Sequence, residues 1–530
     1  MTLDTATGLD LAARATAHAW IDEHMDELSA WHSRIWDLAE PAWREYRSAA
    51  WYVETLRSYG FEVEEGSAGM PTAFSATWTN DAGSGGDGPV LLTYAEYDAV
   101  PGNNQSASTA PAPRDGLSGY APGHTDPHSA LGISTLAGLL ATQHAMTTHG
   151  IAGTLRYTGE PAEKMHGSKV VHGLRGYYDG VDAIVSFHPF YMLPLCNTAR
   201  WDTQCGAYYS KVYTFSCDEA ETWQLENDPN SPIPASHSAA RAPGANAALT
   251  TMYTASRAMQ DAMLPSVGGW SLSDAILLDG QATADNLPTR VARIQFSWRT
   301  PNIEMAEHVL AVLDRNAVHA AAMAHCTVED RWIARSRPGR TNHVLADVLY
   351  RNLATVGAPV YDAEAVRIAN DIRATLGADP VERPFLAACE QLIEPQEAER
   401  LLREHMPAWQ RNWTSDDYVE MTHYAPTVRF YVSRPALEPI PGKGAYPAWV
   451  MNALGGIPAT IDPTIRTAGK TIAGTFLELL GSPELLAEAR AEFDRRTAEE
   501  PMPPLLDADF EAPIDLPWPD YSGHGGHRRW

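Results

Sequence analysis

Short apolar segments alternate with longer amphipathic ones along much of the chain. Three segments of strand length, PVLLTYA (89–95), GTLRYTG (153–159) and VDAIVSF (181–187), each end in polar residues, and helical spacing of apolar positions separates them. Parallel strands joined by helices produce this order. We therefore predict an α/β fold whose catalytic domain has a central, mostly parallel sheet flanked by helices.

Breaks in the pattern divide the chain into domains. Residues 9–60 have helical spacing, with Trp20, Trp31, Trp36 and Trp43 as expected core or interface aromatics. ALTTMYTASRAMQDAM and MAEHVLAVLDRNAVHAAAMA predict the two helices of an inserted α+β domain, and Ser482 and Pro483 suit the start of a last helix. The expected divisions are a first segment of the catalytic domain (1–211), the inserted domain (212–330), a second segment of the catalytic domain (331–495) and a proline-rich C-terminal tail (496–530) that either wraps the surface or is disordered.

The segment GHTDPHSALG places His124, Asp126 and His128 within five residues, directly before an apolar helical run. Imidazole nitrogens and carboxylate oxygens suit a divalent ion such as zinc or manganese, and catalytic sites use about three protein ligands plus an open position. The same residues also suit an ordinary helix start, with Asp126 or Ser129 as the cap and solvated histidines. Both interpretations stay open on this segment alone.

Polar groups also follow each predicted strand. Glu96 and Asp98 follow the first, Glu160 and Glu163 the second, and His188 the third. Ligands collect beyond the carboxyl ends of strands in open α/β sheets, so these groups and the histidine segment are expected to form one site. Each of them singly would also suit a solvated loop.

Four segments in order, AEYDAVPG, GHTDPHSALG, TGEPAEKMHGSK and GYYDGVDAIVSFHP, resemble the aminoacylase and carboxypeptidase superfamily of metallohydrolases. They are most similar to its p-aminobenzoyl-glutamate hydrolase-like amidohydrolase branch, whose members carry AEYDALPG, GHACGH, a GTPAEE-like segment and a closing HP. The resemblance covers roughly residues 15–495. It implies a dinuclear metallohydrolase fold in which the inserted domain is a lid that pairs edge to edge in a homodimer.

Two departures from that pattern concern metal ligands. The second Glu of the family's GTPAEE segment binds a metal, but Lys164 stands there, and a protonated lysine cannot be a ligand. The family's last ligand, a His, is replaced at GKGAYPAWV by Tyr446 or Pro447. The two lost ligands serve the same metal in the family. We therefore expect one divalent metal per chain, held by Asp126, His128 and His188 with help from His124, and His166 is a substitute ligand or an outer donor.

The resemblance also implies roles for other residues. Glu163 corresponds to the general base, and the Lys164 ammonium would supply the positive charge of the missing cation. Asn286 and Arg299 correspond to the residues that hold the substrate carboxylate, although Arg299 also suits an ordinary strand-edge cation. His237 corresponds to a lid His that supports the oxyanion in the neighbouring subunit, or is a loop residue.

Composition narrows the choice of partners. The chain has 530 residues with 39 basic and 66 acidic side chains, a net charge of -27 that disfavours nucleic acids and anionic membranes. The start lacks a basic segment followed by an apolar core, no run approaches a membrane span, and the five cysteines lack metal-type spacing. These features favour a cytoplasmic protein with reduced thiols.

The functional expectation is hydrolysis of an amide C-N bond in a carboxylate-bearing small molecule, such as an N-acyl or N-aroyl amino acid. Two alternatives remain open. One is an aminohydrolase that releases ammonia from an aromatic acid, and the other is a non-catalytic protein that binds carboxylates on the same scaffold. Residues 101–122, rich in Gly, Pro, Ser and Asn, are an insertion relative to the family and are expected to be a loop that borders the pocket.

Overall fold

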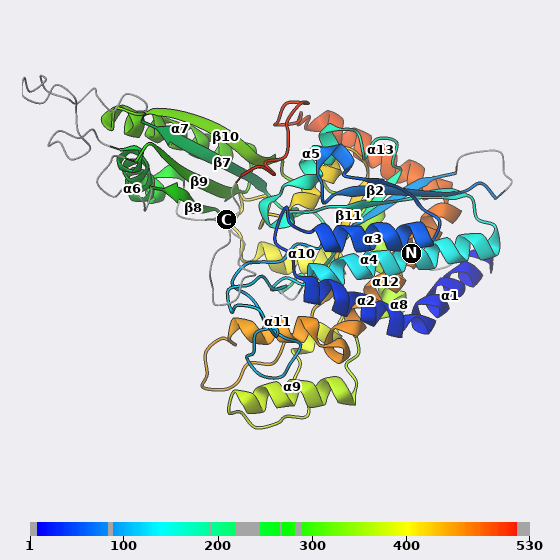
Figure 1. Ribbon diagram of the computed structural model, residues 1–530. Helices are drawn as coiled ribbons and strands as arrows, with labels where there is room; N and C mark the ends of the chain where they lie inside the picture. The colour runs from blue at the N-terminus through cyan, green and yellow to red at the C-terminus, as the bar shows by residue number, and fades with distance from the viewer. Residues whose placement is uncertain are drawn as a thin grey trace, which may run out of the picture. The chain divides into compact units, whose positions relative to one another are not determined.

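The structure, a computed structural model, describes residues 8–82, 88–190, 193–217, 244–264, 268–280 and 289–516. The chain divides into two compact units (Figure 1). Unit 1 comprises residues 1–204, 339–405 and 417–530, and unit 2 comprises residues 205–338 and 406–416. Unit 2 corresponds to the inserted domain, and its ends lie several residues outside the expected 212–330.

Unit 1 is built on a seven-stranded sheet with the order β1-β2-β4-β3-β5-β11-β6. The neighbours β4, β3, β5 and β11 run parallel, whereas β2 and β6 pair antiparallel at either side. The predicted mostly parallel sheet is therefore confirmed, and the three apolar segments form β3, β4 and β5. The strands are β1 (Glu62–Glu65), β2 (Phe74–Asn80), β3 (Val90–Ala95), β4 (Gly153–Gly159), β5 (Ala183–Phe190), β6 (Thr198–Ala199) and β11 (Thr427–Ser433).

Helices flank this sheet. α4 (His128–His149) and α12 (Pro458–Gly481) pack against each other and against β5, with α4 also on β3 and α12 on β11 (Figure 1). Nearly all of α4 is buried, which explains why its apolar residues do not keep to one face. The other helices are α1 (Gly8–Glu23), α2 (Met25–Leu38), α3 (Tyr46–Ser58), α5 (Ser168–Leu174), α8 (His343–Val356), α9 (Ala363–Thr375), α10 (Pro395–Arg403), α11 (Ala448–Gly456) and α13 (Pro483–Glu499).

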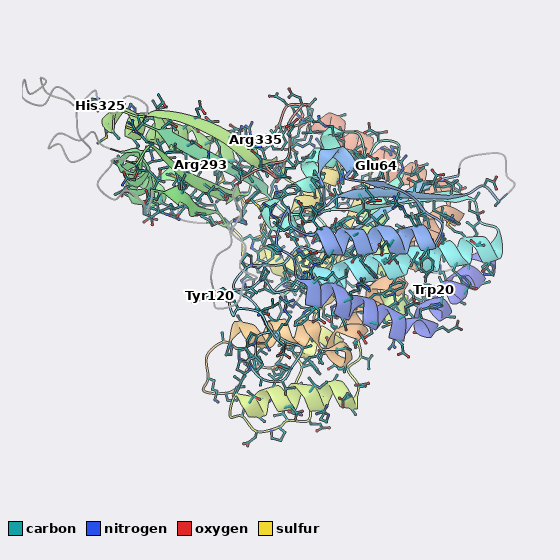
Figure 2. All side chains as sticks on the ribbon, in the orientation of Figure 1. Trp20, Glu64, Tyr120, Arg293, His325 and Arg335 are labelled. Atoms are coloured by element: carbon teal, nitrogen blue, oxygen red, sulfur yellow. The ribbon has the colours of Figure 1, made fainter. Side chains whose placement is uncertain are left out.

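The N-terminal tryptophans and the C-terminal residues both contribute to packing. Trp20, Trp36 and Trp43 are buried and Trp31 is half-buried, as the helical spacing predicted (Trp20 is labelled in Figure 2). Phe510, Ala512 and Ile514 pack in the cluster around Trp43. The described part of the tail, up to residue 516, therefore lies against the core of unit 1.

Unit 2 is a four-stranded antiparallel sheet with the order β10-β7-β9-β8. Its helices α6 (Ala245–Met263) and α7 (Ile303–Met323) confirm the two that were predicted, and they pack on each other and on the sheet. Figure 2 shows Arg293 on β9 and Arg335 on β10 within this unit. The strands are β7 (Ala207–Ser216), β8 (Ser271–Asp279), β9 (Val291–Thr300) and β10 (Thr327–Ser336). Among the described residues of both units, no helix is long and apolar enough to cross a membrane.

Candidate active site

Charged and histidine side chains meet beyond the carboxyl ends of β3, β4 and β5 in unit 1. Glu96 and Asp98 follow β3, Glu163 follows β4, and His188 lies in the last residues of β5. The parallel register of these strands brings their ends to the same edge of the sheet. Since α4 begins at His128, its first turn adds this imidazole to the same place.

His128 is held by a carboxylate on one side and faces several ligand-type groups on the other. Its Nδ1 lies 2.7 Å from Asp98 Oδ1, and its Nε2 lies 3.3 Å from both Glu96 Oε2 and Glu163 Oε2. Burial and the Lys164 charge lower the pKa of His128, but Asp98 and Glu96 outweigh them and raise it to about 9. A metal that bound Nε2 would displace this proton.

His188 is oriented in a similar way. Its Nδ1 lies 2.8 Å from the Pro189 carbonyl oxygen, so the proton belongs on Nδ1 and Nε2 presents its lone pair. The rings of His128 and His188 are perpendicular, with centroids 5.6 Å apart. Carboxylate or carbonyl partners of this kind commonly orient metal-binding histidines.

These side chains fit a metal ion. One ligand atom each from Glu96, His128 and His188 lies within 4.8 Å of the others, and all three residues are buried. Asp126 Oδ2 lies 3.7 Å from His188 Nε2 and can join them. The structure thus brings Asp126, His128 and His188 together as the sequence suggested, and adds Glu96.

Asp126 does not cap α4. The residue at the cap position is Pro127, and no side-chain hydrogen bond caps this helix. Asp126 Oδ2 instead accepts a hydrogen bond from the Lys164 ammonium at 3.0 Å. The geometry therefore favours a site residue over a helix cap.

His124 and His166 do not enter the groups that could hold a metal among the described residues. His124 is buried, and its Nε2 lies 3.3 Å from the Ile35 carbonyl oxygen on α2. Burial lowers the pKa of His124, which keeps it neutral. The structure therefore places His124 behind the site, as packing for the loop.

Glu163 occupies a short turn whose backbone is strained. The turn is bracketed by Ala162 (φ 56°) and His166 (φ 53°), both in the left-handed region without being glycine. A buried Glu45 carboxylate accepts the Ala162 backbone N–H at 2.8 Å and helps to hold the turn. Burial would raise the pKa of Glu163, but Lys164 and His128 outweigh it and lower that pKa. Glu163 is therefore ionised and able to accept a proton.

Lys164 points into the site. Its Nζ lies 3.0 Å from Asp126 Oδ2, 3.1 Å from His128 Nε2 and 3.2 Å from Glu163 Oε2, and its backbone N–H donates to Asp98 Oδ2 at 2.9 Å. Burial opposes the charged form, yet Asp126 and Glu163 raise the pKa of Lys164. The ammonium is thus a permanent cation beside the proposed base.

Several residues that complete the site had no role assigned from the sequence. Glu96 and Asp98 stood out as polar groups after β3, but their roles beside His128 depend on the folded geometry. Lys169, fully buried, pairs with Glu96 and Asp417, each at 2.7 Å. No local sequence pattern indicates this role for Lys169, because its two partners are 73 and 248 positions away in the chain.

The proposed substrate-binding residues belong to unit 2. Arg299, near the end of β9, donates from Nε to Ser415 Oγ at 2.8 Å, and its guanidinium lies over the Tyr208 ring at 4.9 Å. This stacking holds the planar group in one orientation. Asn286 and His237 lie outside the described residues.

The insertion at 101–122 is held by a backbone bridge at its ends and by hydrogen bonds from Arg114. Val100 and Gly123 form an antiparallel bridge, and the Arg114 guanidinium binds the backbone carbonyl oxygens of Asp37, on α2, and of Pro122. Tyr120, labelled in Figure 2, lies in this loop and is 66% exposed. The insertion is therefore an ordered loop attached to the segment that carries His124, Asp126 and His128.

Gly123→Ala should disturb that segment. A Cβ at this position would lie 1.9 Å from the Asn103 carbonyl oxygen, so the backbone must shift. We expect weaker binding of Mn²⁺ in titration calorimetry, by about tenfold, because misplaced ligands bind metals poorly. Gly119→Ala in the same loop is the control, since its Cβ would meet nothing within 4 Å. Equal affinities of the two variants would contradict a role for this close approach.

Comparisons with known proteins agree with the sequence resemblance. No protein-family model matches the chain. The chain is 26% identical over 344 residues to a subunit of the p-aminobenzoyl-glutamate hydrolase of Escherichia coli (strain K12), and the match spans 65% of each protein. It is 27% identical over 194 residues to the Xaa-Arg dipeptidase of Mus musculus, covering 35% of this chain and 40% of that one. The matches thus span less than two thirds of these relatives.

A solved structure shows the same fold. The aminobenzoyl-glutamate utilization protein from Klebsiella pneumoniae superposes with a TM-score of 0.52 at 15% identity, covering 86% of this chain and 98% of that one. Together these comparisons confirm the resemblance to the aminoacylase and carboxypeptidase superfamily, in its p-aminobenzoyl-glutamate hydrolase-like branch.

Proposed function

We propose that this chain, similar to the p-aminobenzoyl-glutamate hydrolase-like branch, is a metal-dependent amidohydrolase. Its substrate would be a carboxylate-bearing small molecule such as an N-acyl or N-aroyl amino acid. One observation carries the proposal, namely that Glu163 Oε2 stands 3.3 Å from His128 Nε2, beside the group of Glu96, His128 and His188 that can hold a metal. A base beside a metal position is the arrangement that hydrolysis of a C-N bond requires.

The metal would be one divalent ion, zinc or manganese, held by Asp126, His128 and His188 with Glu96 close by. When bound, such an ion supplies Lewis-acid polarisation and lowers the pKa of water to near 7. Asp98 and the Pro189 carbonyl keep the two imidazoles in the orientation that binding needs. His124, placed against Ile35, contributes by supporting the loop.

The side chains would move the protons as follows. Glu163 accepts a proton from the attacking water, whose oxygen forms the new bond to the amide carbon. Glu163 then gives this proton to the leaving nitrogen as the C-N bond breaks, and the products are a carboxylic acid and an amine. The Lys164 ammonium, 3.2 Å from Glu163 Oε2, stabilises the negative charge that develops on the carbonyl oxygen.

Arg299 would recognise the substrate carboxylate. Its Nε is bound to Ser415 and its plane lies over the Tyr208 ring, so the terminal guanidinium nitrogens suit a bidentate carboxylate. Asn286 is proposed to assist it. His237 is proposed to support the oxyanion from the neighbouring subunit of a homodimer.

The homodimer would form through unit 2, the inserted domain. β8 is an edge strand of the four-stranded sheet, and its Ile276 and Leu278 side chains are exposed. An edge strand with apolar side chains can extend its sheet with a second copy of itself. Sedimentation velocity of the purified protein would show a species of twice the chain mass.

A substrate panel tests the proposed activity. The purified protein would be incubated with Zn²⁺ or Mn²⁺ and with p-aminobenzoyl-glutamate, N-acyl amino acids and dipeptides with C-terminal arginine, and the products separated by liquid chromatography with mass detection. We expect an amine and a carboxylic acid, and no turnover after chelation. Ammonia released from an aromatic acid would instead identify the aminohydrolase. Binding of carboxylates without metal or turnover would identify a non-catalytic protein.

A further inference from the structure

A side-chain ammonium occupies the point where three potential ligand groups converge. Lys164 Nζ lies between 3.0 and 3.2 Å from an oxygen of Asp126, an oxygen of Glu163 and Nε2 of His128. The two carboxylates accept hydrogens from this ammonium, and the His128 imidazole can accept the third only when its Nε2 is unprotonated. The same lone pairs could otherwise bind a metal, and two cations cannot share one set of ligands without strong repulsion.

A second cation approaches Asp126 from the opposite oxygen. Arg434 Nη1 lies 3.8 Å from Asp126 Oδ1, whereas Lys164 is bound to Oδ2. Arg434 follows directly after β11 and is buried. Its guanidinium also donates to the carbonyl oxygens of Thr125 at 2.6 Å and Met451 at 3.1 Å. This guanidinium therefore ties the Asp126 loop to α11 and cannot move away easily.

Permanent positive charge already lies beside Asp126. Lys164 and Arg434 stand 3.0 and 3.8 Å from its two carboxylate oxygens. A divalent ion placed next to Lys164 would therefore be repelled at short range.

One group of ligand atoms could hold a divalent ion while Lys164 keeps its place. Glu96, His128 and His188 each present an atom within 4.8 Å of the others. If a metal takes His128 Nε2, Lys164 retains its two carboxylate partners, Asp126 and Glu163. The lysine and one metal can therefore coexist.

We propose that Lys164 and Arg434 form a fixed pair of cations on Asp126 that takes the place of a second metal ion. This inference rests on the proposed function, because it specifies the cations of the same site. It predicts that the lysine excludes a second metal by charge. Replacing it with a carboxylate should open that second position.

Metal content of the Lys164→Glu variant tests this prediction. Wild type and variant would be dialysed against Mn²⁺, then against metal-free buffer, and measured by inductively coupled plasma mass spectrometry. We expect the variant to hold one equivalent per chain more than wild type. The control is Lys443→Glu, which makes the same charge change at an exposed lysine and should hold the wild-type amount. Two equivalents in wild type, or no gain in a folded Lys164→Glu protein, would overturn the inference.

The metal contents of wild type and Lys164→Glu distinguish failure of the inference from failure of the proposed function. If wild type holds no metal and Lys164→Glu holds one equivalent, the exclusion by lysine stands while the metal-dependent activity of wild type fails. If the variant does not fold, Lys164→Gln and Arg434→Gln remove one positive charge each without adding a carboxylate. We expect Mn²⁺ to bind at least about tenfold more tightly to the first and about threefold more tightly to the second in titration calorimetry. Unchanged or weaker binding to both would overturn the proposed pair.

Discussion

Replacing Glu163 with glutamine is expected to reduce kcat for amide hydrolysis by about a thousandfold, within the range for loss of a general acid–base group. Glutamine has nearly the same shape as glutamate but cannot accept the proton of the attacking water. The Lys164 and His128 charges lower the pKa of Glu163, so the wild-type carboxylate is ready to act at neutral pH. Steady-state kinetics on whichever amide the panel identifies would measure the change.

The metal content of Glu163→Gln shows whether Glu163 acts as the base or as a metal ligand. Glu163 is not among Asp126, His128 and His188, so Glu163→Gln should retain the wild-type amount of metal. Glu382→Gln, at an exposed position, is the matched control and should keep full activity. Loss of metal together with activity would mean that Glu163 is a ligand, and a kcat within tenfold of wild type would remove it from the role of base.

Replacing Lys169 with methionine should lower the free energy of unfolding by about 3–5 kcal/mol, as expected when one partner of a buried ion pair is removed. Its ammonium lies 2.7 Å from both Glu96 and Asp417, and all three side chains are fully buried. Methionine fills a similar volume but leaves two carboxylates facing each other without a cation. Urea unfolding followed by circular dichroism would measure the loss.

The ion pair between Lys470 and Asp22 provides a control for Lys169→Met. Lys470 lies 2.6 Å from Asp22, whose side chain is half exposed, and Lys470→Met should cost less than about 1 kcal/mol. Added Mn²⁺ should restore part of the stability of Lys169→Met, because a cation near Glu96 replaces some of the missing charge. A loss similar to that of Lys470→Met would show that Glu96 and Asp417 become protonated at little cost.

Local sequence patterns predicted the sheet of unit 1 well where a single segment contained the information. The segments that form β3, β4 and β5 were apolar over strand length and ended in polar groups, and this alone placed Glu96, Glu163 and His188 near one sheet edge. The sequence also predicts the helix after Pro127, but it does not decide whether Asp126 caps that helix or belongs to the site. The choice between a cap and a site residue depended on Lys164, which lies 38 positions from Asp126.

Groups that act through distant partners could not be predicted. His124 has the same spacing to Asp126 as His128 has, yet α2 provides a carbonyl for His124 and Asp98 orients His128. Arg434 is 308 positions from Asp126, and no local pattern links the two. Side-chain direction at these positions is set by packing of elements that are far apart in the chain.

The order of residues was enough to predict the α/β architecture, the inserted α+β segment and a candidate site in which Glu163 and His188 follow strands and His128 precedes a helical run. The spacing of apolar residues and the residue types that follow each strand are properties of short segments, so they can be recognised from the sequence alone. Which charged side chains pair with one another could be learned only from the folded chain. Electrostatic interactions act through space and depend on distance and burial, and these quantities place Lys164 and Arg434 on Asp126, and Lys169 on Glu96.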